Sequence, residues 1–198
     1  MDICKILEIV ALVAGIAYMA LQVLQNRYMW YFNLVTALAS LAVTAINQLW
    51  ASSALNLYFI TTSVIGIFSW RALARKDKED NGGKEEDRIR LVRLTLKAGL
   101  ISAAVAVVGG VGVYFLLSNT THDPSPVADA ATMILSVIAA WWLTRPYKEQ
   151  WIVWLVADVI AIVMYASQGL WGMTALFTLY VASCVVGYIH WRKQGVYV

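Results

Sequence analysis

Side chains capable of binding chemistry gather in one apolar stretch, residues 150–167. Two indoles, a carboxylate and a phenol lie there on one helical face, at steps of three, four and seven residues: Trp151, Trp154, Asp158 and Tyr165. Indoles with a carboxylate one turn away suit a flat, electron-poor or cationic ring, through stacking, cation–π attraction and charge pairing. A carboxylate well inside an apolar segment is costly and is rarely without a function. The pattern therefore predicts a binding site for a small ring-shaped solute.

A second polar series lies in the stretch 29–47, at steps of three and four residues: Asn33, Thr36, Ser40, Thr44 and Asn47. Hydroxyl groups such as those of Ser40 and Thr44 can bond backbone carbonyls within their own helix. The asparagine amides are not expected to be satisfied in that way. We predict that Asn33, Thr36 and Asn47 contact the solute, and that the two polar series line a central path.

An internal repeat with an offset of 121 residues relates the two stretches. Twelve residues of 30–71 recur without a gap in 151–192: Trp30, Leu34, Val35, Ala45, Leu49, Trp50, Ala54, Leu55, Val64, Gly66, Trp70 and Arg71. Repeats of membrane-spanning segments are typical of transporters. A duplicated scaffold keeps its repeat, whereas a site for an asymmetric solute has to lose it. The repeat is lost where Asn33 matches Trp154 and where Ala37 matches Asp158, which supports the predicted site.

The residues that the repeat keeps are interpreted as scaffold. Six tryptophans near the ends of apolar stretches are expected to anchor the chain at the membrane–water interface: Trp30, Trp50, Trp70, Trp151, Trp171 and Trp191. Glu8 and Asp129 occupy equivalent places in the two copies. A repeated acid more often ties a helix to its neighbours than binds an asymmetric ligand, so both are predicted to be structural.

The composition places these segments in a membrane. Hydrophobic residues make up 61% of the 198-residue chain and charged residues 14%. A span needs about 20 mostly apolar residues, and seven stretches qualify: 4–24, 29–47, 50–70, 94–117, 126–144, 150–167 and 170–190. The connection 71–93 is charged and is predicted to be a solvated linker. A cleavable signal is not expected, because Glu8 interrupts the first apolar run.

The basic residues predict an orientation. With seven spans, every Lys and Arg except Lys5 falls on one side of the membrane. Basic loops stay in the cytoplasm, so we expect the N-terminus outside and the C-terminus inside a bacterial inner membrane. The net charge of +3 then reflects topology, and the expected partner is the lipid bilayer rather than nucleic acid. The placing of the two Cys and two His residues predicts no disulfide, no metal site and no cofactor.

The repeat also predicts the fold class. Each half has three spans, and a fourth span between them restores the chain direction, so that the halves run parallel. We predict an all-α integral membrane protein with seven transmembrane helices, in which two three-helix repeats are joined by a linker helix. Its parts are a first repeat, a cytoplasmic charged loop, the linker helix, a second repeat and a cytoplasmic tail: 1–72, 73–93, 94–120, 121–192 and 193–198. Gly109, Gly110 and Gly112 permit close packing of the linker helix.

Five short segments carry a resemblance to a known family: Glu8 with Gly15, Gly66 to Trp70, Asp129, Leu135-Ser136 and Gln150-Trp151-Ile152-Val153-Trp154. In this order they resemble the PnuC family of bacterial vitamin transporters. The resemblance implies a seven-helix carrier, related in plan to the SWEET sugar transporters, in which Trp151 and Trp154 stack on the vitamin ring. It also implies facilitated diffusion of nicotinamide riboside, thiamine or riboflavin, with a cytosolic kinase that traps the vitamin. A homo-oligomer is compatible with this plan.

Departures from the family pattern bear on the substrate. Gln150 and Asp158 stand where the family usually has Asn, Asn33 stands where a Gly is common, and Asn56 replaces a Gln as a candidate polar contact. An ionised Asp only accepts hydrogen bonds, which suits an aminopyrimidine or a thiazolium and points toward thiamine. Nicotinamide riboside is also cationic and is the first choice, with thiamine a close second.

Three other functions are weighed against vitamin uniport. Asp158 could couple transport to protons, which would allow accumulation without a kinase. A SWEET-like sugar carrier shares the plan, although sugars need no buried acid. An enzyme is not expected, because no nucleophile–base pair or metal-ligand spacing lies on an inner helix face.

Overall fold

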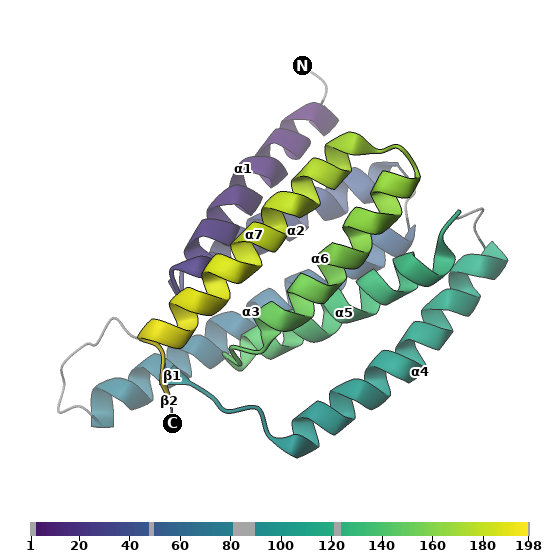
Figure 1. Ribbon diagram of the computed structural model, residues 1–198. Coiled ribbons are helices and arrows are strands. Elements are labelled where there is room, and N and C mark those ends of the chain that lie inside the picture. Colours follow the sequence, from purple (N-terminus) through teal and green to yellow (C-terminus); the bar gives the residue numbers. More distant parts are fainter. Residues whose placement is uncertain (1–2, 48–49, 81–89, 121–123, 198) are drawn as a thin grey trace. The chain divides into compact units, whose positions relative to one another are not determined.

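Seven long α-helices and two short strands make up the described part of the chain, residues 3–47, 50–80, 90–120 and 124–197, in a computed structural model (Figure 1). The elements follow in this order: α1 (Ile3–Val23), α2 (Met29–Ile46), α3 (Trp50–Asp80), β1 (Arg90–Leu91), α4 (Leu96–Thr120), α5 (Pro126–Thr144), α6 (Gln150–Ser167), α7 (Trp171–Gln194) and β2 (Val196–Tyr197). All seven helices are long and apolar enough to cross a membrane, with mean hydropathy of 1.4 to 2.3 over their spans. The seven predicted spans are confirmed.

Helix α3 is longer than the sequence predicted. The span was expected to end at residue 70, with a loop from 73 to 93, but the helix continues to Asp80. The added turns contain Ala, Leu, Arg, Lys and Glu, which favour helix and outnumber the two Asp residues. An ion pair of 3.2 Å between Arg75 and Glu79, four residues apart, supports the extension. The prediction of a loop is therefore wrong for 73–80, and residues 81–89 lie outside the described part.

The chain divides into two compact units. The first contains residues 1–91, 144–146 and 193–198 and includes helices α1 to α3. Helix α1 packs on α2, and α2 packs on α3. Strand β1 pairs in parallel with β2, with Arg90 opposite Val196 and Leu91 opposite Tyr197. The three helices form the frame that carries the first polar series.

The second unit contains residues 92–143 and 147–192 and includes α4 to α7. Its apolar core is built on Ile138, Trp142 and Tyr147. The Trp142 indole N–H donates to Ser102 Oγ at 2.9 Å, which ties α5 to α4. A Cβ atom at Gly109 would lie 2.7 Å from Cδ1 of Ile134. Helix α4 therefore packs closely on α5 at Gly109, as predicted, whereas nothing lies within 4 Å of a Cβ atom at Gly112.

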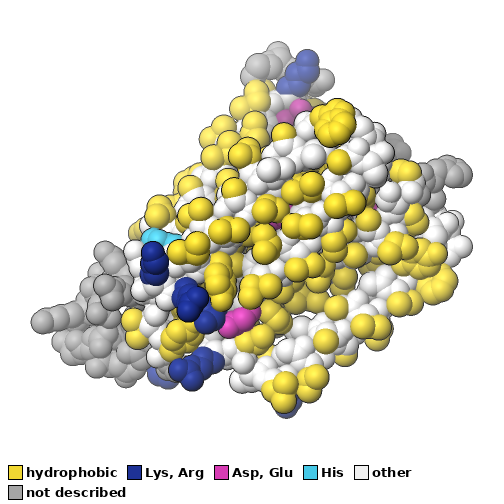
Figure 2. Space-filling model, in the orientation of Figure 1, with side chains coloured by type: hydrophobic (Ala, Val, Ile, Leu, Met, Phe, Trp, Pro, Cys, Tyr) yellow, Lys and Arg dark blue, Asp and Glu magenta, His cyan; other side chains and the backbone are white. Residues whose placement is uncertain are grey.

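Large apolar side chains are exposed along the helices. Figure 2 shows hydrophobic side chains spread along α1, α4 and α7 on the visible face. On α4 they include Leu100, Val107, Val108 and Phe115. A water-soluble protein rarely exposes apolar surface on this scale, whereas lipid covers it without cost. The chain is a multi-pass membrane protein.

Candidate functional site

Helices α6 and α7 meet through three contacts that are seven residues apart on each helix: Trp151 with Trp191, Asp158 with Cys184, and Tyr165 with Phe177. Steps of seven return to nearly the same face of a helix. The sum of the two residue numbers is the same in each pair, which is the register of an antiparallel helix pair. The face of α6 that the sequence singled out is therefore the face that packs on α7.

The Asp158 carboxylate is buried, with 4% of its surface exposed. Its Oδ2 accepts a hydrogen bond from the Cys184 thiol at 3.5 Å. A thiol is a weak donor, so it satisfies little of the four-site acceptor capacity of a carboxylate. In the part of the chain that the structure describes, no basic side chain lies within 4.0 Å of Asp158. A buried carboxylate without a cation is costly, and a cationic solute or a proton would relieve that cost.

Aromatic rings continue from this contact along α7. The rings of Tyr165 and Phe177 have centroids 5.3 Å apart, and those of Phe177 and Tyr180 are 5.4 Å apart. Tyr180 lies one turn from Cys184 on the same helix, so the rings and the carboxylate lie along one α6–α7 interface. We call the residues of this interface the Asp158 cluster: Asp158, Tyr165, Phe177, Tyr180 and Cys184. A negative centre beside aromatic faces is the arrangement that attracts a flat cation.

The Trp154 indole N–H is buried, and no hydrogen-bond partner for it is found among the described residues. Trp154 lies one turn before Asp158 on α6, and its side chain is half-buried. Buried polar groups are nearly always paired in folded proteins. An unpaired donor one turn from a carboxylate that accepts a single weak hydrogen bond fits a polar solute that supplies the complementary groups.

Trp151 occupies a different environment. Its ring packs edge-on against Trp191, with centroids 5.7 Å apart and planes at 88°. A Cβ atom added to Gly187 would overlap the Trp151 ring, so the glycine makes room for it. This packing favours a scaffold role for Trp151. Its stacking on a vitamin ring stays a prediction.

The first unit repeats this packing at the equivalent residues. Trp30 meets Trp70 with centroids 5.9 Å apart and planes at 81°. A Cβ atom at Gly66 would overlap the Trp30 ring in the same way. The repeated residues thus form the same local structure twice, which favours the interpretation that they are scaffold.

The expectation that these tryptophans anchor the membrane interface is wrong for four of them, since Trp30, Trp70, Trp151 and Trp191 are at most 3% exposed. The repeated glycine on the facing helix leaves space that the indole of Trp30 or Trp151 fills. These side chains are therefore buried by helix packing and do not lie at the membrane–water interface. Trp171 is 70% exposed and fits the prediction. The side chain of Trp50 lies outside the described part.

Asn33 makes the main polar contact of the first polar series. Its amide nitrogen donates to Ser63 Oγ at 2.9 Å, and Ser63 donates to the carbonyl of Phe59 at 2.7 Å. Ser63 is the repeat equivalent of Cys184. The same position on the third helix of each copy therefore holds the polar side chain of the second helix, Asn33 in one copy and Asp158 in the other.

Three other candidates bond backbone carbonyls of their own helices. Thr36 donates to Phe32 at 2.9 Å, Asn47 to Val43 at 2.8 Å and Asn56 to Ser52 at 3.0 Å. Thr44 does the same with Leu41 at 3.1 Å, as predicted. The expectation that asparagines would not be satisfied in this way holds for Asn33 but is wrong for Asn47 and Asn56, because an amide reaches the carbonyl four residues earlier as readily as a hydroxyl does.

The remaining candidates differ in exposure. Gln150 is fully buried at the first residue of α6, and Tyr165 is half-buried. The sequence reading missed Phe177 and Cys184, the α7 partners of Tyr165 and Asp158. A signal was available, because the repeat pairs Phe177 with Asn56 and Cys184 with Ser63, two further breaks.

The acids that the repeat pairs lie in dissimilar surroundings. Asp129 is half-buried in the first turn of α5, where a negative charge is favoured by the helix dipole. Glu8 is exposed on α1. The structural role predicted for both acids stays a prediction.

Comparisons with known proteins agree with this picture of a multi-pass carrier. The family model of the nicotinamide mononucleotide transporter matches residues 5–193. Nicotinamide riboside transporter PnuC of Escherichia coli is 23% identical over 96% of this chain and 87% of that protein. The PnuC of Neisseria mucosa is 26% identical over 83% of this chain and 63% of its own length.

The fold has a solved counterpart. The crystal structure of the vitamin B3 transporter PnuC superposes with a TM-score of 0.69, at 24% identity, over 95% of this chain and 81% of that one. The family match covers almost the whole chain, and the related proteins are transporters rather than enzymes. The chain therefore belongs to the PnuC family of membrane transporters.

Proposed function

We propose that the chain takes up nicotinamide riboside by facilitated diffusion. The observation that carries the proposal is the buried Asp158 carboxylate, which has no basic partner within 4.0 Å among the described residues and lies in a cluster with aromatic rings. The pyridinium ring of nicotinamide riboside is flat and positively charged. It complements both features, through charge pairing and through cation–π contact. The related proteins from two bacteria carry nicotinamide riboside in their names, which supports this choice.

Thiamine is the second candidate substrate, and Asp158 is the observation that favours it. Thiamine combines a cationic thiazolium with an aminopyrimidine that donates hydrogen bonds. A carboxylate accepts hydrogen bonds from such a group, whereas the Asn that the family usually has would both donate and accept. Both vitamins carry a positive charge that complements Asp158, so a binding measurement is needed to decide between them.

We propose contacts for the remaining candidates on the same basis. Trp154 offers a ring and an unpaired N–H one turn from Asp158. Asn33 offers the oxygen of its amide, since its nitrogen is engaged by Ser63. The candidates with weaker support are those whose donors are engaged within their own helices or that pack as scaffold: Thr36, Asn47, Asn56, Gln150 and Trp151.

The proposed architecture is two parallel three-helix repeats joined by α4. The repeated Trp–Gly–Trp packing in α2–α3 and α6–α7 supports a duplication. The proposed parts are those given by the sequence, with the first repeat in 1–72, the linker helix in 94–120 and the second repeat in 121–192. The basic residues support an extracellular N-terminus and a cytoplasmic C-terminus in a bacterial inner membrane.

A binding screen tests the substrate. Purified chain is titrated calorimetrically with nicotinamide riboside, thiamine and riboflavin, and Asp158→Asn is measured beside Glu8→Gln, which also removes an in-span acid but lies outside the cluster. We expect nicotinamide riboside to bind the chain and Glu8→Gln equally, and Asp158→Asn to bind it more weakly. Binding of thiamine alone would replace the first candidate by the second. Binding of none would contradict the proposal.

Liposome uptake tests the mechanism. A uniporter equilibrates its vitamin and accumulates label only when a vitamin kinase and ATP are enclosed, since phosphorylation traps the product. Accumulation without kinase that depends on a pH gradient, and that Asp158→Asn abolishes, would instead establish proton coupling through Asp158. In that outcome the binding screen still reports the substrate, so the two proposals are separable.

A further inference from the structure

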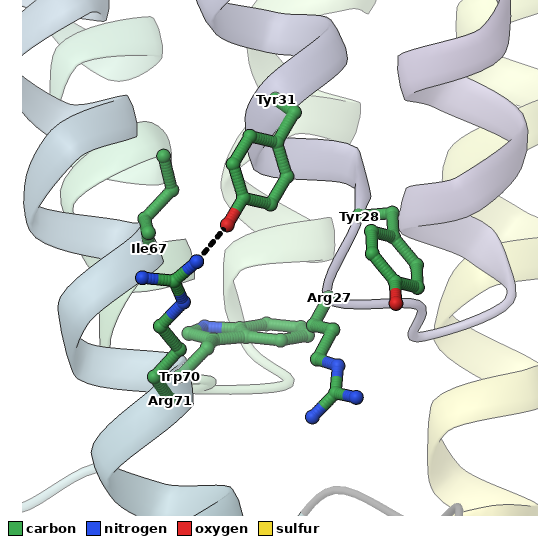
Figure 3. A pocket seen from close by; sticks show the side chains of 6 residues that line it. All are labelled: Arg27, Tyr28, Tyr31, Ile67, Trp70 and Arg71. Atoms are coloured by element: carbon green, nitrogen blue, oxygen red, sulfur yellow. Dashed lines mark hydrogen bonds between the residues drawn. The ribbon is translucent and has the colours of Figure 1, made fainter.

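A cavity of about 250 Å³ lies in the first unit, at the end of α3 where apolar residues give way to basic ones. Six residues line it, from the α1–α2 connection, α2 and α3: Arg27, Tyr28, Tyr31, Ile67, Trp70 and Arg71. Figure 3 shows the two arginines flanking the Trp70 indole, with the two tyrosines above them. Its lining residues belong to the first unit, whereas Asp158 and its contacts belong to the second.

Tyrosines hold both arginines in place. The guanidinium of Arg71 donates to the Tyr31 hydroxyl and lies 5.8 Å from the centroid of the Tyr31 ring. The guanidinium of Arg27 lies 5.7 Å from the centroid of the Tyr28 ring. A guanidinium has five donors in a rigid fork, so these contacts orient it and leave most of its N–H groups available. The cavity presents two preorganised cations.

Acidic groups that could neutralise these cations are missing from the described surroundings. In the described part of the chain, no carboxylate lies within 4.0 Å of Arg27 or Arg71, and the ion pair found there joins Arg75 to Glu79. Between residues 3 and 76 the sequence contains one acid, Glu8, in the second turn of α1, whereas Arg27 follows the other end of that helix. The cavity therefore favours an anion.

An apolar track leads away from Arg71 along α3. Phe68 and Val64 lie three and seven residues before Arg71, on the same helical face, and are 65% and 40% exposed. Tyr28, which lines the cavity, is 54% exposed. Paired cations at the end of an exposed apolar helix face match the amphipathic form of a phospholipid, with its phosphate beside its acyl chains.

The second copy of the repeat lacks this arrangement. Lys148 and Arg192 stand in place of Arg27 and Arg71, so both cations are kept. Glu149 replaces Tyr28 and Ile152 replaces Tyr31, which removes both tyrosines and adds a carboxylate. The enrichment of basic residues in cytoplasmic loops accounts for the cations of both copies. It does not account for Tyr28 and Tyr31, which contact the arginines in the first copy only. The copy thus offers a matched internal control.

We propose that this cavity binds the phosphate of an anionic phospholipid through Arg27 and Arg71, with its acyl chains along Val64 and Phe68. On the orientation proposed above, the lipid belongs to the cytoplasmic leaflet. None of the residues proposed above to contact the vitamin lines this cavity, so the lipid is a structural or regulatory partner rather than cargo.

Native mass spectrometry of the full chain, with equal amounts of phosphatidylglycerol and phosphatidylcholine, tests the proposal. We expect selective retention of phosphatidylglycerol, reduced about 25-fold in the double variant Arg27→Gln/Arg71→Gln, since each basic group near an anionic surface contributes a factor of about five. The matched control Lys148→Gln/Arg192→Gln removes the same charge from the second copy and should retain the lipid within about twofold of the unmodified chain.

A second variant keeps the test valid if the arginine pair is needed for folding. Tyr28→Glu/Tyr31→Ile gives the first copy the side chains of the second and should also lose the selectivity. Equal losses in both copies, or equal retention of the two lipids, would overturn the proposal. Glycerol 1-phosphate, which has the phosphate without acyl chains, should not compete; if it competes as well as the lipid, the site takes a free phosphate and the assignment to lipid is wrong.

Discussion

The helix pairs α2–α3 and α6–α7 differ in what they hold rather than in how they pack. Both pack an edge-on tryptophan pair over a glycine, and both have a small polar residue, Ser63 or Cys184, at the same place on the third helix of the copy. In the first copy that residue meets a neutral amide, and in the second it meets a carboxylate. The same local packing can thus carry two different polar groups.

The difference has a direct energetic meaning. The amide of Asn33 is paired by a hydroxyl at 2.9 Å, whereas the carboxylate of Asp158 receives a weak thiol donor at 3.5 Å. The first contact satisfies its donor, and the second leaves most of a buried negative charge unsatisfied. The second copy is therefore the place where a cationic solute gains most.

Removal of the Asp158 carboxylate should have the largest effect on solute binding, because it abolishes the main chemical difference between the two helix pairs. Asp158→Ala is expected to weaken binding of nicotinamide riboside by about 10- to 100-fold, because hydrogen bonds to a charged group contribute about 1.5–3 kcal/mol. Calorimetric titration of the detergent-purified variant measures this. An affinity within about twofold of the unmodified chain would place the solute elsewhere.

Substitution of the two glycines that face the indoles, Gly66 and Gly187, should lower stability to a similar extent. Gly66→Ala and Gly187→Ala each place a Cβ atom against an indole and should lower the free energy of unfolding by about 1–3 kcal/mol. Gly172→Ala is the control, since nothing lies within 4 Å of a Cβ there and alanine favours helix. Thermal unfolding in detergent compares the three, and strongly unequal effects at the two glycines would show that the copies do not share a scaffold.

A subtler change concerns the indole N–H of Trp154. Trp154→Phe keeps an aromatic face and removes the donor, so we expect affinity for the vitamin to fall about three- to tenfold, the effect of one ordinary hydrogen bond. The control is Trp171→Phe, because Trp171 is exposed at the start of α7. Equal affinities for Trp154→Phe and the unmodified chain would remove Trp154 from the site as a donor.

The smallest effect should come from the shared position on the third helix. Ser63→Ala leaves the Asn33 amide without its partner and should cost about 0.5–1.5 kcal/mol of stability. Cys184→Ala removes a weaker bond and should cost less. Paired melting curves decide the order, and a larger loss for Cys184→Ala would mean that the thiol stabilises Asp158 more than its geometry indicates.

The sequence predicted the helices more completely than it predicted the candidate site. Hydropathy alone placed seven spans, and the bounds 126–144 and 150–167 agree with α5 and α6 to the residue. The end of α3 was missed because its last turns are charged: hydropathy marks where a span leaves lipid, not where a helix stops. Local propensity governs that second boundary.

The sequence identified the site residues on α6 but not the α7 residues that contact them. The repeat breaks identified Asp158 and Trp154 on α6, but their surroundings depend on which α7 residues face them. The register that brings Cys184 to Asp158 and Phe177 to Tyr165 is a tertiary property. Likewise, the burial of Trp30 and Trp151 depends on glycines on facing helices, which an interface rule for tryptophan does not take into account.

A structure of the full chain with bound nicotinamide riboside tests the central claim most directly. The account predicts the cationic ring within charge-pairing distance of the Asp158 carboxylate, with Trp154 in contact with the solute. A vitamin bound away from Asp158, with that carboxylate still paired to Cys184 alone, would contradict the claim that the breaks in the repeat mark the binding site.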